Sequence, residues 1–145
     1  HTYQGHPTAC AAGVAVLKEM LSHNIPAQVK EKGERLHQDL RHHFADHPYV
    51  GDVRGRGLFL GIELVRNKET KEPLNPTFNL PEQIRQTAMQ QGLLCYPMGG
   101  TIDGRRGNHI LLAPPFIISD VELDQVVDRL SSTLSAILPV LNKAA

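Results

Sequence analysis

A change from helical to extended patterning near two closely spaced glycines most constrains the fold of this chain. Up to about residue 44, apolar side chains recur at helical spacing. Gly55 and Gly57 then permit backbone angles that other residues avoid, and residues 58–65 (LFLGIELV) have the apolar character of a strand. Because both elements have apolar faces to bury, we expect helices packed on a sheet, which is an α+β fold.

The first part of the sequence predicts two helices. Pro7 suits the first turn of a helix that ends near Met20, and the small and apolar residues between them indicate that this helix is largely buried. Residues 24–26 (NIP) break it, and an amphipathic helix follows over about residues 27–44. The first helix is apolar over much of its circumference, so we expect it to pack against more protein than this chain supplies.

The second part predicts a small sheet and two more helices. In chain order we expect a surface loop over residues 66–79, a helix over 81–91, a strand over 93–96, a glycine-rich loop over 99–108 and a strand over 109–112. Ser119 and Glu122 have the spacing of a capping box, so the last helix should run from Val121 to about Leu138. The expected fold is a small antiparallel sheet of three or four strands covered by helices and preceded by a long buried helix.

Charge and composition exclude several classes of partner. Fifteen basic and fifteen acidic side chains cancel, so nothing indicates a nucleic acid or an anionic membrane. The longest apolar runs are too short to span a bilayer and are broken by proline. Cys10 and Cys95 lie in core-like surroundings, which favours a reduced compartment and predicts a cytoplasmic protein. His1 stands where an initiator methionine is expected, so we expect a fragment of a longer chain.

Four segments, in the same order, resemble those of one enzyme family. Residues 1–10 (HTYQGHPTAC) closely resemble a signature of class III aminotransferases, which are pyridoxal-phosphate enzymes of fold type I. Residues 50–64 (VGDVRGRGLFLGIEL) are similar to the glycine/arginine turn and strand of that family. Residues 92–94 (GLL) and 112–118 (LAPPFII) resemble its next strand and its closing proline motif.

The resemblance implies that this chain is the C-terminal part of such an enzyme. Residues 1–25 would be a phosphate-contacting segment and linking helix from the large domain, and residues 26–145 the C-terminal small domain. The intact parent would be a homodimer that uses pyridoxal 5'-phosphate to transfer an amino group from an amine or ω-amino acid to an oxo acid. The lysine that holds the cofactor as a Schiff base would lie upstream, so this chain alone would be inactive and contains no assigned catalytic residue.

The resemblance also implies two cofactor-binding residues. In the family, the threonine at the position of Thr2 binds the cofactor phosphate of the neighbouring subunit, so Thr2 would do so through its hydroxyl. Tyr3 lies close enough to contribute its backbone amide. Hydroxyl and N–H donors beside a helix start are suited to a phosphate. The alternative is that Thr2 is an ordinary cap or strand residue.

Arginines are the candidates for binding a substrate carboxylate, because a guanidinium donates two parallel hydrogen bonds to it. Many family members have an arginine just ahead of the proline motif, where this chain has Leu111. Some amine-using relatives carry a mobile arginine in the preceding loop, which makes Arg106, and after it Arg105, the candidates here. Their alternative is a pair of solvated loop charges. For Arg54 and Arg56 we favour a structural role over an anion cradle.

The residues alone leave two rival interpretations open. His1, His6 and Cys10 could form a metal site, but zinc sites need about four well-placed ligands, so we expect no metal. The chain could also be a free-standing, noncatalytic α+β ligand-binding or dimerisation module. The amino donor and acceptor are not indicated by any residue of the chain.

Overall fold

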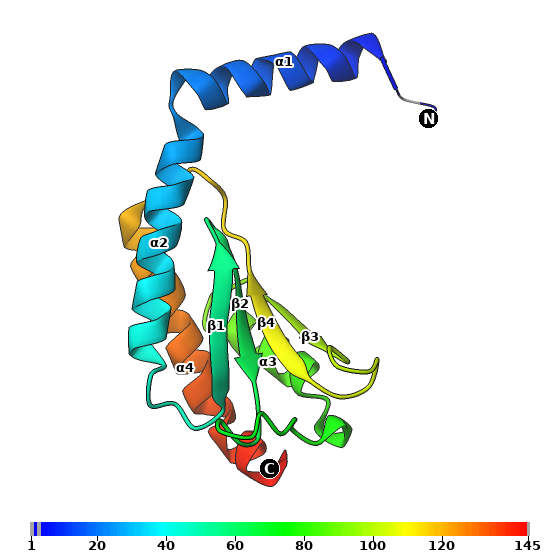
Figure 1. The fold of residues 1–145 in the computed structure, drawn as a ribbon, viewed down its shortest axis with the longest axis vertical. Helices are drawn as coiled ribbons and strands as arrows, with labels where there is room; N and C mark the ends of the chain where they lie inside the picture. The colour runs from blue at the N-terminus through cyan, green and yellow to red at the C-terminus, as the bar shows by residue number, and fades with distance from the viewer. Residues whose placement is uncertain (1, 3, 145) are drawn as a thin grey trace.

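The structure, a computed structural model, describes residue 2 and residues 4–144, with no side chain described for residue 144. In chain order its elements are α1 (Pro7–Ser22), α2 (Ile25–His43), β1 (Val50–Arg56), β2 (Phe59–Leu64), the 3₁₀ turn η1 (Pro76–Phe78), α3 (Leu80–Gln90), β3 (Tyr96–Gly99), β4 (Asn108–Leu112) and α4 (Asp120–Ala144). The four strands form one antiparallel sheet in the order β1-β2-β4-β3 (Figure 1). The α+β fold with a small antiparallel sheet is confirmed.

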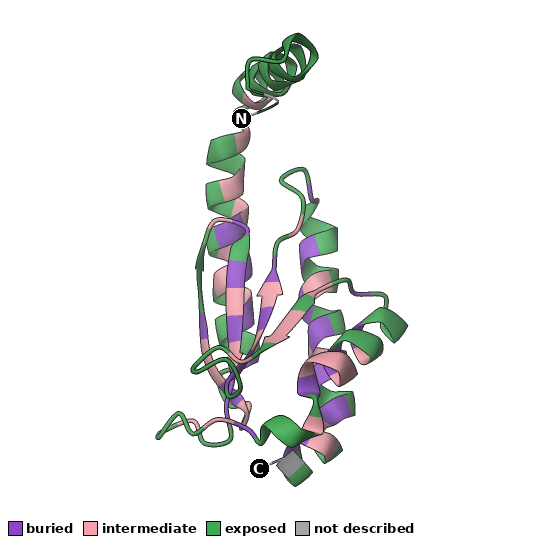
Figure 2. Cartoon of the chain, turned by 90° about the vertical axis from the view of Figure 1, so that its right-hand side faces the viewer, coloured by how far each residue is buried: buried purple, intermediate pink, exposed green. Residues whose placement is uncertain are grey.

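The core lies between one face of the sheet and helices α2, α3 and α4 (Figures 1 and 2). Alternate residues of β2 and β4 point into it, as the pleat of a strand requires. Ile62 pairs directly with Ile110, and neither is accessible to solvent. The helices meet them with fully buried side chains: Leu36 and Leu40 from α2, Ile84 from α3, and Leu123, Leu130 and Leu134 from α4.

The opposite face of the sheet has no helix over it among the described residues. Cross-strand pairing places Arg54, Gly61, Leu111 and Tyr96 in one row across all four strands on this face. Tyr96 is 63% exposed, and Leu111 is half-buried. This open face is therefore a mixed polar and apolar surface, centred on β2 and β4.

Helix α1 extends away from one end of the domain and turns aside from the direction of α2 (Figure 1). It contains no buried residue, and Figure 2 shows it exposed over almost its whole length. The expectation of a long buried helix is therefore not met within this chain, because α2 offers α1 only its first turn and the sheet lies elsewhere. Packing of α1 against protein outside these residues stays a prediction.

Helix α2 packs against the β1–β2 turn through a close approach of the backbone at Gly33 to the backbone at Gly57. A Cβ atom added to Gly33 of α2 would lie 2.2 Å from the carbonyl carbon of Gly57. Gly57 itself has φ +55°, in the left-handed region that glycine adopts without strain. His37 donates from Nε2 to the carbonyl of Val53 at 2.9 Å, one turn further along α2. These contacts fix the glycine/arginine turn against the helix.

The sequence predictions differ from the structure at three elements. Strand β1 was not predicted, since residues 50–56 alternate charged side chains and glycine with only two buried valines. The strand predicted over 93–96 begins only at Tyr96, because residues 93–95 lead from the end of α3 into the sheet. Helix α4 continues through Pro139 to Ala144, since Ile137 and Leu141 remain buried against the core.

Candidate functional site

The predicted phosphate-binding segment lies at the free end of α1. Thr2 is exposed in a turn that precedes the helix, and Tyr3 lies outside the described residues. The helix begins with Pro7, and neither a side-chain cap nor an acidic residue occupies its first turn. The first-turn amide groups receive no side-chain cap from any described residue, and with the positive end of the helix dipole they are suited to an anion. This set of donors fits a phosphate group.

The predicted substrate arginines lie on the β3–β4 loop (residues 100–107). Asp103 organises this loop: one carboxylate oxygen accepts from the backbone amides of Arg105 and Arg106 at 3.0 and 2.7 Å, and the other accepts from Nε of Arg106 at 2.7 Å. These hydrogen bonds lower the pKa of the Asp103 carboxyl to about 2. The charge of Arg106 is thus balanced by its ion pair with Asp103, whereas the side chain of Arg105 is exposed and makes no ion pair with any described residue.

The two candidate sites are not brought together within this chain. Thr2 precedes the far end of α1, while the β3–β4 loop lies at the other side of the sheet domain (Figure 1). Arg106 instead lines a hollow of about 290 Å³ together with Arg66 and the 3₁₀ turn. Arg66 is itself paired with Glu72 at 3.1 Å, so this hollow holds no uncompensated arginine.

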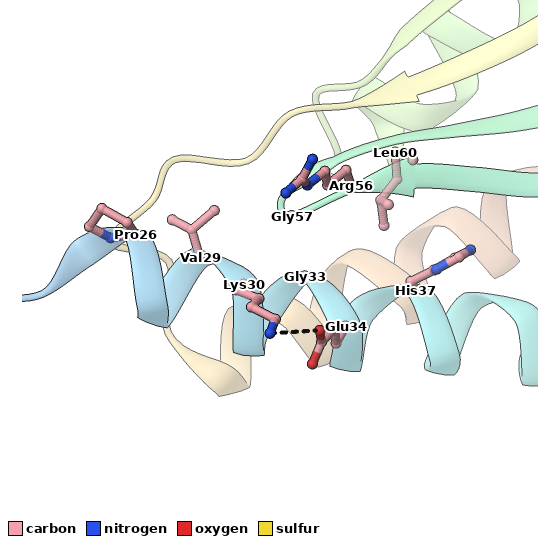
Figure 3. Close-up of a pocket in the computed structure, with 10 residues that line it drawn as sticks. Pro26, Val29, Lys30, Gly33, Glu34, His37, Arg56, Gly57 and Leu60 are labelled. Carbon is pink, nitrogen blue, oxygen red and sulfur yellow. Dashed lines mark ion pairs between the residues drawn. The ribbon is translucent and has the colours of Figure 1, made fainter.

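Arg54 and Arg56 differ in their surroundings, which the sequence did not indicate. Arg54 pairs with Asp52 of its own strand at 2.9 Å and approaches Glu63 of β2 at 3.5 Å, in agreement with the structural role favoured from the sequence. Arg56 is exposed and has neither a side-chain hydrogen bond nor an ion pair among the described residues. It lines a hollow of about 550 Å³ between α2 and the β1–β2 turn (Figure 3).

None of the six lysines is buried in the structure. Lys32, Lys68 and Lys71 donate to the backbone carbonyls of Ile118, Ala45 and Gly51. A lysine that forms a Schiff base needs burial or a neighbouring cation to depress its pKa. Such burial is therefore absent at all six within the described residues, and the placement of the Schiff-base lysine outside this chain stays a prediction.

Within the described part of the chain, no three histidine, cysteine, aspartate or glutamate side chains are grouped closely enough to hold a metal ion. His1 of the alternative metal site lies outside that part. No helix of the described residues is both long enough and apolar enough to cross a membrane.

The pattern of the class III aminotransferase family matches residues 1–134. This chain therefore belongs to the class III aminotransferase family, which is a family of pyridoxal-phosphate enzymes, as its resemblance to that family implied.

Relatives of known sequence agree. An uncharacterized aminotransferase of Schizosaccharomyces pombe is 41% identical over 140 residues, which are 97% of this chain and 30% of that protein. An uncharacterized aminotransferase of Bacillus subtilis is 36% identical over 143 residues, covering 99% of this chain and 32% of that protein. The chain thus spans about a third of the length of these relatives.

Solved structures share the fold. An (S)-enantioselective omega-transaminase from Thermomicrobium roseum superposes with a TM-score of 0.83 at 33% identity, over 95% of this chain and 29% of that one. An amine transaminase from an uncultivated Pseudomonas species, solved in a PLP-bound form, gives a TM-score of 0.81 at 33% identity over 94% and 29%. These similarities extend from α1 through the sheet to α4, so they cover both parts of the chain.

Proposed function

We propose that this chain is the C-terminal part of a pyridoxal-phosphate-dependent aminotransferase that transfers an amino group from an amine or ω-amino acid to an oxo acid. The family match over residues 1–134 carries the proposal. Residues 1–25 form the segment and helix that link to a large domain, and residues 26–145 form the small domain. The exposed, largely apolar α1 supports this division, since a helix of this kind needs further protein to cover it. The family match and the extent of the relatives favour this function over a free-standing noncatalytic module.

The cofactor-binding role of this chain falls on its first residues. Thr2 donates its hydroxyl, and Tyr3 its backbone amide, to the cofactor phosphate of the neighbouring subunit in a homodimer. The cofactor, when bound, supplies the electron sink for amino transfer. The start of α1 adds backbone amide donors, and among the described residues its first turn has neither a side-chain cap nor an acidic group to repel the phosphate.

The substrate-binding role falls on the β3–β4 loop. Arg105 and Arg106 both have the chemistry to pair with a substrate carboxylate. Arg106 must first exchange its ion pair with Asp103, whereas Arg105 is available without breaking any. The loop therefore offers one free and one exchangeable guanidinium to an oxo acid or ω-amino acid. We place the enzyme in the cytoplasm, where the two free cysteines stay reduced.

The first test is amino transfer by the full-length protein. We expect transfer from an ω-amino acid or simple amine to an oxo acid, measured by product formation, and no transfer by residues 1–145 alone. Transfer by the 145-residue chain would contradict the assignment of the Schiff-base lysine to a segment outside it.

The second test is Thr2→Ala in the full-length protein. Loss of one hydrogen bond to a charged phosphate should weaken cofactor binding about 10- to 100-fold, measured by titrating cofactor into the stripped enzyme. Thr70→Ala, at an exposed position of the loop after β2, is the matched control and should bind normally. An unchanged cofactor dissociation constant for Thr2→Ala would remove Thr2 from the site.

A further inference from the structure

The hollow between α2 and the β1–β2 turn is a formed site that the proposed function does not use. It encloses about 550 Å³ and lies near the end of the domain from which α1 departs (Figures 1 and 3). Apolar side chains that line it include Val29 and Leu60, and its polar side chains are those of Arg56, Lys30, Glu34 and His37.

The walls of this hollow are held in place by the fold. The backbone contact between Gly33 and Gly57 leaves no room for α2 and the turn to approach further. His37 is occupied by its hydrogen bond to the Val53 carbonyl, so it ties the same two elements together rather than facing a ligand. Arg56 therefore extends from a turn of fixed position, which lowers the entropic cost of binding a partner there.

The hollow has a net positive charge, because Arg56 and Lys30 face a single acidic side chain, Glu34. Glu34 has Lys30 as its partner at 3.9 Å, the ion pair drawn in Figure 3. Arg54, two residues before Arg56, is satisfied by Asp52 and Glu63. Arg56 alone of these groups lacks an acidic partner within the described residues. The guanidinium of Arg56 is suited to a carboxylate, because this planar group donates two parallel hydrogen bonds to it.

We propose that this hollow is an interdomain docking site in which Arg56 pairs with a carboxylate side chain of the same polypeptide from outside residues 1–145. The inference rests on the proposed function, because it requires the rest of an aminotransferase chain. The occupant is a protein segment, since the hollow is lined by Pro26 and Val29 at the end of α2 that adjoins α1. The apolar side chains Val14, Leu17 and Leu21 of α1 are all more than half exposed, so the same segment of chain can cover them. The chain spans only 30% of its relative from S. pombe, which leaves ample chain to cover both α1 and the hollow.

Zero-length cross-linking of the full-length protein tests this directly. In Arg56→Lys the new amine keeps the charge, and carbodiimide joins it to a carboxylate only when the two are in contact. We expect a peptide linked from position 56 to an acidic residue outside residues 1–145, identified by mass spectrometry. The Lys30–Glu34 link, at a pair already in contact, serves as the internal control for access of the reagent to the hollow. Arg41→Lys, exposed on the same helix, is the matched control and should give no such link.

Limited proteolysis is a second test of docking, and it does not require a lysine at position 56. Arg56→Gln should raise the rate of limited proteolysis at the α1–α2 junction (residues 22–26) of the full-length protein about three- to fivefold at low salt, and less at high salt. Arg41→Gln should leave the rate unchanged. An unchanged rate in Arg56→Gln would overturn the proposal. The proposal would also be overturned if the Lys30–Glu34 link formed while position 56 stayed unlinked. A link from position 56 only to Glu34, or only to a small free carboxylate added to the reaction, would overturn it as well.

The same preparation separates this inference from the proposed function. If the unsubstituted full-length protein performs amino transfer while position 56 stays unlinked, only the docking site is refuted. If it performs none, the proposed function is refuted, whatever the cross-link shows.

Discussion

Gly33→Ala in this 145-residue chain should destabilise the fold, although alanine is the better helix former. Taken alone, the substitution inside α2 should gain about 1 kcal/mol from helix propensity. The added Cβ, however, would lie 2.2 Å from the carbonyl carbon and 2.3 Å from the carbonyl oxygen of Gly57, whereas ordinary contact begins at 3.4 Å. Because both atoms are backbone, no flexible side chain can yield, and α2 or the turn must move by more than an ångström.

The loss of stability arises because moving α2 away from the β1–β2 turn disrupts their packing. Overpacking of this kind costs about 1–3 kcal/mol, and displacement would also stretch the hydrogen bond from His37 to the Val53 carbonyl. After subtraction of the propensity gain, we expect a net loss of about 2 kcal/mol in the free energy of unfolding. In urea denaturation followed by circular dichroism, this corresponds to a midpoint lower by about 1 M, for a slope of about 2 kcal/mol per molar urea.

Gly13→Ala is the matched control. Gly13 lies within α1, and a Cβ atom there meets nothing within 4 Å, so only the propensity gain remains. We expect an equal or higher helix content and no fall in the urea midpoint. A Gly33→Ala variant as stable as the wild type, or more so, would refute the reasoning, since the contact with Gly57 would then not constrain the fold.

Two further predictions concern titrating groups. Burial raises the pKa of the Cys95 thiol to about 11, whereas Cys10 is exposed. Iodoacetamide at pH 8 should therefore alkylate Cys10 of the 145-residue chain well before Cys95. Equal rates of alkylation, measured by peptide mass spectrometry, would contradict this. Burial, with Lys68 and His43 nearby, lowers the pKa of His47, whose Nε2 is buried without a hydrogen-bond partner among the described residues. The unfolded chain therefore binds this proton more readily, so stability should fall as the pH drops below about 6.5, and His47→Leu should reduce that fall in urea midpoints compared between pH 7.5 and 5.5.

The helices of the fold could be predicted from the sequence because their signals are local. The capping box at Ser119 is present as expected, with the Ser119 amide donating to the Glu122 carboxylate at 2.7 Å and the Glu122 amide to the Ser119 hydroxyl at 3.3 Å. Helix α3 ends at Gln90, close to the predicted bound of 91, and Gly92 follows with a φ of +76°. Strand β1 could not be predicted in this way, because its charged outer face and its glycines are favourable only once β2 pairs with it.

The candidate site was predicted less completely, for a related reason. The resemblance to the family made Thr2, Arg105 and Arg106 candidates, but it did not indicate that Asp103 forms an ion pair with Arg106. Arg54 and Arg56 look equivalent in the sequence. The pairing of β1 with β2 brings Glu63 near Arg54, whereas Arg56, at the end of β1, has no acidic partner among the described residues. Such differences depend on strand register, which local patterns do not determine.

The two edge strands of the sheet also bear on what happens when copies of this chain meet. An unpaired strand edge is a template on which another chain can add a strand and begin to aggregate. β3, one edge, contains Pro97, which cannot donate a backbone hydrogen bond, and it is only four residues long. β1, the other edge, has a register irregularity between Val50 and Asp52 and exposed arginines at 54 and 56. Both edges are therefore poor templates, and the sheet is protected against growth into fibrils even when the open face is uncovered.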